Sequence, residues 1–165
     1  MKKLLIILII AVVNSSCLRV TFSGASIHPE AKTFSVQYFE NNASLVMPTL
    51  SQTITEQLRD KIMGQTQLSM VRSGGDMAFE GEITGYTLQP VAIQSGETAA
   101  LTQLTITISV RFFNRLDEEK NFESRFSRYQ QFSSSANFAS LEQGLVEEIV
   151  EELVEDIFNK AFVNW

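Results

Sequence analysis

Alternation of apolar and polar residues predicts the strands of this chain. Residues 33–39 place three large side chains on one face, namely Phe34, Val36 and Tyr38. The alternation resumes around 79–83 after a Ser-Gly-Gly-Asp turn. Gly81 and Gly85 fall in or just after this run. Glycine inside a strand indicates a bulge or a close approach of another backbone, so we expect one of these here.

The longest alternation covers residues 101–113 and predicts the central strand of a sheet. Its apolar positions run from Leu104 to Phe112, and polar residues fill the other face. Residues 117–121 then predict a turn into a second alternating run at 122–132. Two such runs joined by a short turn are typical of an antiparallel hairpin.

Helical spacing of apolar residues predicts two helices. The first begins near Pro48 and ends near Gly64. The second follows Ser140, which forms a predicted capping box with Gln143. Its apolar stripe comprises Leu141, Leu145, Ile149, Leu153 and Ile157, widened by Val146, Val150 and Val154.

These elements predict an α+β fold in which two amphipathic helices pack on one face of a small, mainly antiparallel or mixed sheet. We expect residues 33–165 to form a single domain. The predicted core comprises Phe34, Val36, Ile54, Leu58, Ile106, Ile108, Val110, Ile149, Leu153 and Ile157.

The N-terminal segment has the layout of an export signal. Lys2 and Lys3 precede ten apolar residues, which is half of the roughly 20 that a membrane-spanning helix needs. The small or polar residues Asn14, Ser15 and Ser16 then lead to Cys17, whose position resembles the lipidation site of bacterial lipoproteins, although Asn14 stands where such sites usually have leucine. We therefore predict a signal peptide at 1–16, acylation of Cys17, and a tether at 17–32 that carries the domain at the membrane.

Composition excludes several classes of function. Cys17 and His28 are the only residues of their kinds in 165, so neither an intramolecular disulfide nor a Cys/His zinc cluster can form. The net charge of −6 argues against nucleic-acid binding. Nucleotide-binding and zinc-protease motifs are absent from the sequence, and His28 lies in the predicted tether, where a general base is badly placed. The sequence predicts no enzyme, no metal site and no cofactor.

Two groups of polar residues are candidate contacts with a ligand or partner. The polar face of the central strand carries Thr105, Thr107, Ser109 and Arg111. Arg111, Arg125 and Arg128 lie on the last two predicted strands, where they suit phosphate or carboxylate ligands or serve to discourage edge-to-edge aggregation. The acidic residues of the second helix, which fall between its apolar positions, are interpreted as a solvated outer face.

Four separated segments, at 38–43, 79–86, 104–108 and 156–165, resemble the LptE family of lipopolysaccharide-assembly lipoproteins, in the form typical of Bacteroidota. This resemblance implies a periplasm-facing lipoprotein in the inner leaflet of the outer membrane. Such a protein plugs an LptD-type β-barrel, helps deliver lipopolysaccharide to the cell surface, and catalyses no reaction. Only Cys17 matches the family residue by residue.

Further expectations follow for the candidate contacts. Thr107 would face the barrel, because a polar strand face suits a water-lined interior. The three arginines would face lipid A phosphates. The alternative function is a freestanding lipoprotein, either a binding module or a structural protein, with the same anchor and no barrel partner.

Overall fold

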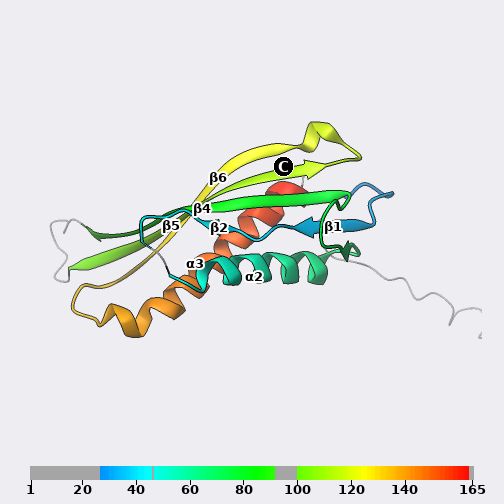
Figure 1. Cartoon of the computed structure of the whole chain (residues 1–165). Helices are drawn as coiled ribbons and strands as arrows, with labels where there is room; N and C mark the ends of the chain where they lie inside the picture. The colour runs from blue at the N-terminus through cyan, green and yellow to red at the C-terminus, as the bar shows by residue number, and fades with distance from the viewer. Residues whose placement is uncertain (1–26, 46, 92–99, 164–165) are drawn as a thin grey trace, which may run out of the picture.

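A mixed sheet packed against two helices makes up the fold (Figure 1). The structure, a computed structural model, describes residues 27–45, 47–91 and 100–163. Both helices lie on the same side of the sheet, which confirms the predicted α+β class. The elements in chain order are β1 (Thr33–Val36), β2 (Glu40–Asn41), α2 (Leu50–Gln65), β3 (Ser69–Met70), β4 (Met77–Val91), β5 (Leu101–Asn114), the 3-10 helix η1 (Glu118–Lys120), β6 (Phe122–Ser133) and α3 (Phe138–Phe162).

The sheet combines parallel and antiparallel pairs. Its strand order is β3-β1-β4-β5-β6, and β2 pairs with β4. β1 lies parallel to β4, whereas β4–β5 and β5–β6 are antiparallel. The β5–β6 ladder runs without a register shift, which confirms the predicted hairpin. The β4–β5 ladder shifts between Ile83 and Gly85, so the bulge falls at one of the two glycines that predicted it.

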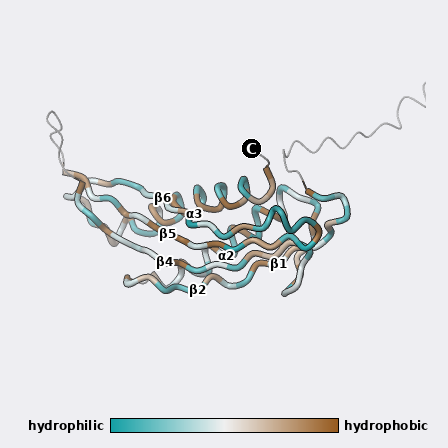
Figure 2. Tube along the Cα trace, turned by 90° about the horizontal axis from the view of Figure 1, so that it is seen from above, coloured by the Kyte–Doolittle hydropathy of each residue, from teal (hydrophilic) through white to brown (hydrophobic). Residues whose placement is uncertain are grey.

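The core lies between the sheet and the helices. Apolar and polar residues alternate along β4 and β5 (Figure 2). The buried apolar residues of these strands form one cluster with those of α2 and α3. Phe79 belongs to an aromatic cluster, with its ring centroid 4.8 Å from that of Phe112 and 5.9 Å from that of Phe162. All ten residues predicted for the core are buried.

The predicted strand at 33–39 is wrong in its extent. β1 ends at Val36, and Tyr38 lies outside the core with 56% of its surface exposed. Phe39 takes its place in the core, and its backbone N–H donates to Thr55 Oγ1 at 3.1 Å. The Phe39 ring fits because Gly81 has no side chain: a Cβ there would lie 2.3 Å from the ring. What approaches Gly81 closely is thus the Phe39 side chain and not, as predicted, another backbone. This contact accounts for the interruption of the strand.

The predicted start of the second helix is also wrong. α3 begins at Phe138, and Asn137 caps it by accepting a hydrogen bond from the N–H of Ala139 at 3.1 Å. Ser140 lies within the first turn and donates to the Asn137 carbonyl, so it forms no capping box. The Phe138 ring stacks on Phe132 of β6, with centroids 5.4 Å apart. This contact with the sheet stabilises the earlier start.

Asp76 fastens the beginning of β1 to the beginning of β4. Its carboxylate accepts hydrogen bonds from the backbone N–H groups of Lys32 and Thr33 and from the Thr33 hydroxyl, and it pairs with Arg115 at 2.8 Å. The Lys32 N–H and the Arg115 guanidinium hold the pKa of Asp76 well below its ordinary value of 3.8. Four donor groups on one carboxylate therefore hold the chain in place where the predicted tether would enter the domain.

Helices in the described ranges are too short or too polar to cross a membrane. The signal peptide predicted at 1–16, Cys17, and most of the predicted tether lie outside the described residues.

Candidate interaction surface

The helices cover one face of the sheet, and no helix or strand of the described part of the chain lies on the other (Figure 1). The uncovered face carries the alternate residues of β4, β5 and β6 that point away from the core. We call this the open face. Its members include Glu80, Glu82, Gly85, Gln103, Thr105, Thr107, Ser109, Arg111, Glu123, Arg125, Ser127, Tyr129 and Gln131.

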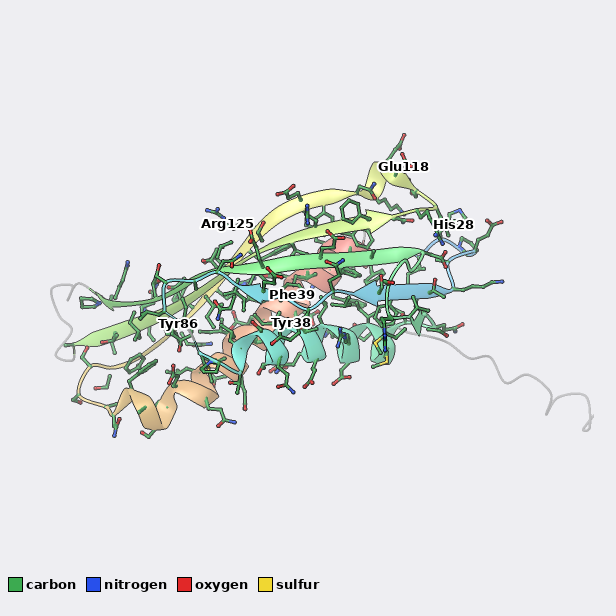
Figure 3. All side chains as sticks on the ribbon, in the orientation of Figure 1. His28, Tyr38, Phe39, Tyr86, Glu118 and Arg125 are labelled. Atoms are coloured by element: carbon green, nitrogen blue, oxygen red, sulfur yellow. The ribbon has the colours of Figure 1, made fainter. Side chains whose placement is uncertain are left out.

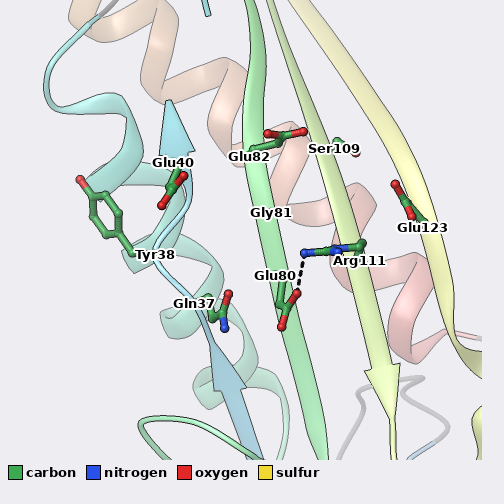
Figure 4. A pocket seen from close by; sticks show the side chains of 9 residues that line it. All are labelled: Gln37, Tyr38, Glu40, Glu80, Gly81, Glu82, Ser109, Arg111 and Glu123. Carbon is green, nitrogen blue, oxygen red and sulfur yellow. Dashed lines mark hydrogen bonds and ion pairs between the residues drawn. The ribbon is translucent and has the colours of Figure 1, made fainter. Parts of the chain in front are cut away.

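One end of the open face is a charged hollow of about 380 Å³ (Figure 4). Arg111 crosses from β5 to β4 and pairs with Glu80 at 2.7 Å. Three further carboxylates line the hollow, those of Glu40, Glu82 and Glu123. Four carboxylates around one guanidinium make this end negative. In the described ranges, no three acidic, histidine or cysteine side chains come together closely enough to hold a metal ion.

The middle of the open face is polar and uncharged. Thr107 and Ser127 share a hydrogen bond of 3.0 Å between their hydroxyls. Gln103 accepts from Gln131 at 3.1 Å. Gly85 lies opposite Thr107, and a Cβ at Gly85 would come within 3.2 Å of the threonine Cβ. Hydroxyl and amide groups keep unused donor and acceptor capacity after these bonds, so this region can bind a polar surface.

The three arginines predicted as candidate phosphate contacts do not come together. Arg111 and Arg125 lie on the open face, and Arg125 projects away from both helices (Figure 3). Arg128 is opposite Ile106 and therefore points to the helix side. There it donates two hydrogen bonds to Asp156, at 2.6 and 2.7 Å, and this pairing raises its pKa. A single phosphate site built from all three is excluded by this geometry.

The acidic residues of α3 are only in part a solvated outer face. Asp156 holds Arg128, Glu155 pairs with Lys61 of α2, and Glu142 accepts a 2.6 Å hydrogen bond from the Tyr86 hydroxyl. Burial, together with this bond, raises the pKa of Tyr86 above its ordinary value of 10.0. These three carboxylates join α3 to β6, α2 and β4.

Tyr38, Glu40 and Tyr86 were not among the predicted candidate residues. Tyr38 and Glu40 reach the charged hollow only because the strand is interrupted at Phe39. Tyr86 reaches the helix side only because the register shifts before Gly85. The glycines at 81 and 85 were the sequence signal for both irregularities, although they did not indicate which side chains would be redirected.

Comparison with known proteins identifies relatives by sequence pattern and by fold. The LptE family, described as lipopolysaccharide-assembly, matches residues 31–161. Among curated proteins no sequence matches.

Two solved structures share the fold at low sequence identity. A minor lipoprotein from Acinetobacter baumannii is 12% identical and has a TM-score of 0.51, over 79% of this chain and 91% of that one. A Helicobacter pylori homologue of a neuraminyllactose-binding hemagglutinin is 6% identical and has a TM-score of 0.53, over 84% and 87% of the two chains. At these identities the likeness concerns the fold alone. The family match, which covers most of the chain, carries the assignment: the protein belongs to the LptE family of lipopolysaccharide-assembly lipoproteins.

Proposed function

We propose that this protein is an outer-membrane lipoprotein, anchored through acylated Cys17, whose domain is enclosed by an LptD-type β-barrel. In this position it would help to deliver lipopolysaccharide to the cell surface without catalysing a reaction. The open face would meet the polar inner wall of the barrel. Cys17 would hold the domain at the inner leaflet, facing the periplasm, because two or three acyl chains anchor a protein firmly.

The composition of the open face is the observation that carries this proposal. A water-lined barrel interior is polar and is matched by hydroxyl and amide groups rather than by an apolar patch. Thr105, Thr107 and Ser127 present such groups at the middle of the sheet, away from the charged hollow. The family match supports the role in lipopolysaccharide assembly, and the barrel partner is the finer part of the proposal.

Thr107→Glu tests the proposed contact. The substitution places a carboxylate at a half-buried position of the open face, between Gly85 and Ser127. A barrel wall docked on this face would remove water from the carboxylate, which is unfavourable. We expect the barrel to co-purify with the unaltered lipoprotein in mild detergent and to be reduced at least about tenfold by this substitution, which corresponds to about 1.4 kcal/mol of binding free energy.

Thr53→Glu is the matched control, because it makes the same change on α2, on the other side of the molecule. Equal recovery of the barrel with both variants would contradict docking through the open face. A lipoprotein that elutes alone would instead support the freestanding function.

Arg125 is the residue of this face best placed to contact an anionic group of lipopolysaccharide. Arg111 is neutralised by Glu80 and Arg128 by Asp156, whereas Arg125 is exposed and has no ion pair within the described part of the chain. We expect Arg125→Ala to weaken lipopolysaccharide binding more than Arg128→Ala does. The reverse order would exclude this assignment.

A further inference from the structure

Within the described ranges, the outer edge of β6 has no strand beside it. β6 is the last strand in the sheet order, and among the described residues only β5 pairs with it. The N–H of Ser134 donates to the carbonyl of Ala100. This bond shows which residues of β6 direct their backbone groups toward β5. In an antiparallel pair the backbone groups of alternate residues point toward and away from the partner strand. The residues whose N–H and C=O groups point outward are therefore Glu123, Arg125, Ser127, Tyr129 and Gln131.

This edge differs from the opposite edge of the sheet in its regularity. There the strands are short, since β2 and β3 have two residues each, and the chain is interrupted at Phe39 between β1 and β2. β6 is 12 residues long, has no proline, and pairs with β5 without a bulge. Proteins usually blunt a long edge by such irregularities, because an unblunted edge is a template for another strand. β6 carries only charged side chains as such a device, namely Glu123, Arg125 and Arg128. These charges discourage pairing with another copy of the same edge, whereas the regular backbone is suited to receiving a strand of complementary charge.

The surroundings of β6 indicate the chemistry of the strand that would fit. On the helix side, Phe122, Phe126 and Phe132 are only partly buried, so an added strand would cover them with apolar side chains. Between β6 and α3 lies a hollow of about 550 Å³ beside Arg128. Its lining includes five carboxylates, those of Glu148, Glu151, Glu152, Glu155 and Asp156.

We propose that the β6 edge binds an extended segment of a partner protein, which adds to the sheet as a strand with alternating apolar and polar residues and a lysine or arginine on its helix side. The basic residue would enter the acidic hollow, where Arg128 is the one guanidinium among the lining residues. A second copy of this chain fits less well. The only cation on the helix side of its β6 is Arg128, and Asp156 already holds that guanidinium.

Amide hydrogen exchange of the full chain in detergent tests the proposal directly. The probe is a ten-residue peptide that alternates threonine and valine, with one central valine replaced by lysine. Bound as a strand, it should slow exchange about tenfold or more at the outward amides of Arg125, Ser127 and Tyr129. The intervening amides of Phe126 and Arg128 already bond to β5 and should change little. A peptide with glutamate in place of the lysine should protect the outward amides less.

Ser127→Pro provides the matched test by mutation. Proline at this position removes the outward N–H of Ser127 but leaves every backbone hydrogen bond to β5 in place. Edge strands tolerate proline at such positions. Ser127→Ala is the control, since both variants lose the hydroxyl bond to Thr107. We expect Ser127→Ala to retain peptide protection and Ser127→Pro to lose it. The exchange experiment on the unaltered chain decides the question even where the proline variant folds poorly.

Three results would overturn the proposal. The outward amides could exchange equally fast with and without the lysine peptide. The glutamate peptide could protect them as well as the lysine peptide does. Protection could also rise with protein concentration in the absence of peptide, in which case the edge pairs with a second copy. Docking through the open face predicts no alternation between outward and inward amides, so the two contacts are distinguished by the same data.

Discussion

Gly81→Ala is expected to destabilise the fold through a single contact with Phe39. The new Cβ would lie 2.3, 2.7 and 2.8 Å from three atoms of the Phe39 ring, closer than any carbon contact permits. Phe39 is fully buried and its N–H is bonded to Thr55, so the ring cannot move into solvent without leaving the core. Either the ring or β4 must shift.

The size of the effect follows from two opposing contributions. Overpacking a core in this way costs about 1–3 kcal/mol. Replacing glycine in a strand interior regains about 0.5–1 kcal/mol, because glycine loses more backbone freedom on folding. We therefore expect Gly81→Ala to lower the free energy of unfolding by about 1 kcal/mol, and by no more than about 2.5 kcal/mol. Because Tyr38 and Glu40 flank Phe39, the charged hollow should also change shape.

Urea denaturation followed by circular dichroism measures this difference. Gly144→Ala is the control, since a Cβ at Gly144 of α3 would have no atom within 4 Å apart from the adjacent helix backbone, and alanine should raise stability by up to about 1 kcal/mol. The double variant with Phe39→Leu should recover part of the loss, with a coupling of about 0.5 kcal/mol or more. A Gly81→Ala protein as stable as the unaltered chain would refute the steric account of the interrupted strand.

Three further predictions concern the Asp76 hydrogen bonds at the start of β1, the attachment of α3 to β4, and the anchor. Because its folded pKa is depressed, Asp76 stabilises the fold fully above about pH 4, and this contribution is lost as the solution is acidified further. The difference in urea midpoint between the unaltered chain and Asp76→Asn should therefore shrink below pH 4, and a constant difference would contradict the assigned pKa. Tyr86→Phe should cost about 0.5–1.5 kcal/mol through loss of the Glu142 bond, whereas Tyr129→Phe, at an exposed position, should cost almost nothing. Cys17→Ser should move the protein from the membrane fraction to the soluble fraction, and retention in the membrane would argue against acylation as the anchor.

Local pattern predicted the secondary structure and the core because periodicity reports directly which side chains face inward. Period-two alternation placed Ile106, Ile108 and Val110 in the core, and helical spacing did the same for Ile149 and Leu153. The two helices and the hairpin followed from the same information. Where the pattern failed, as at Tyr38 and Ser140, a residue of another element supplied the reason. This residue is Gly81 of β4 in the first case and Phe132, at the end of the preceding strand, in the second.

The candidate surfaces were determined in part by sequence and in part by tertiary structure. The alternation by itself assigned Thr107 and Arg111 to a polar strand face. Only the folded chain decided that Arg128 is bound to Asp156 and that Glu40 joins the charged hollow. It also decided that, among the described strands, only β5 pairs with β6. Side-chain direction is a local property of the backbone, whereas ion pairs and strand edges depend on which segments the topology brings together. That juxtaposition is set by packing over the whole domain, and no local sequence pattern encodes it.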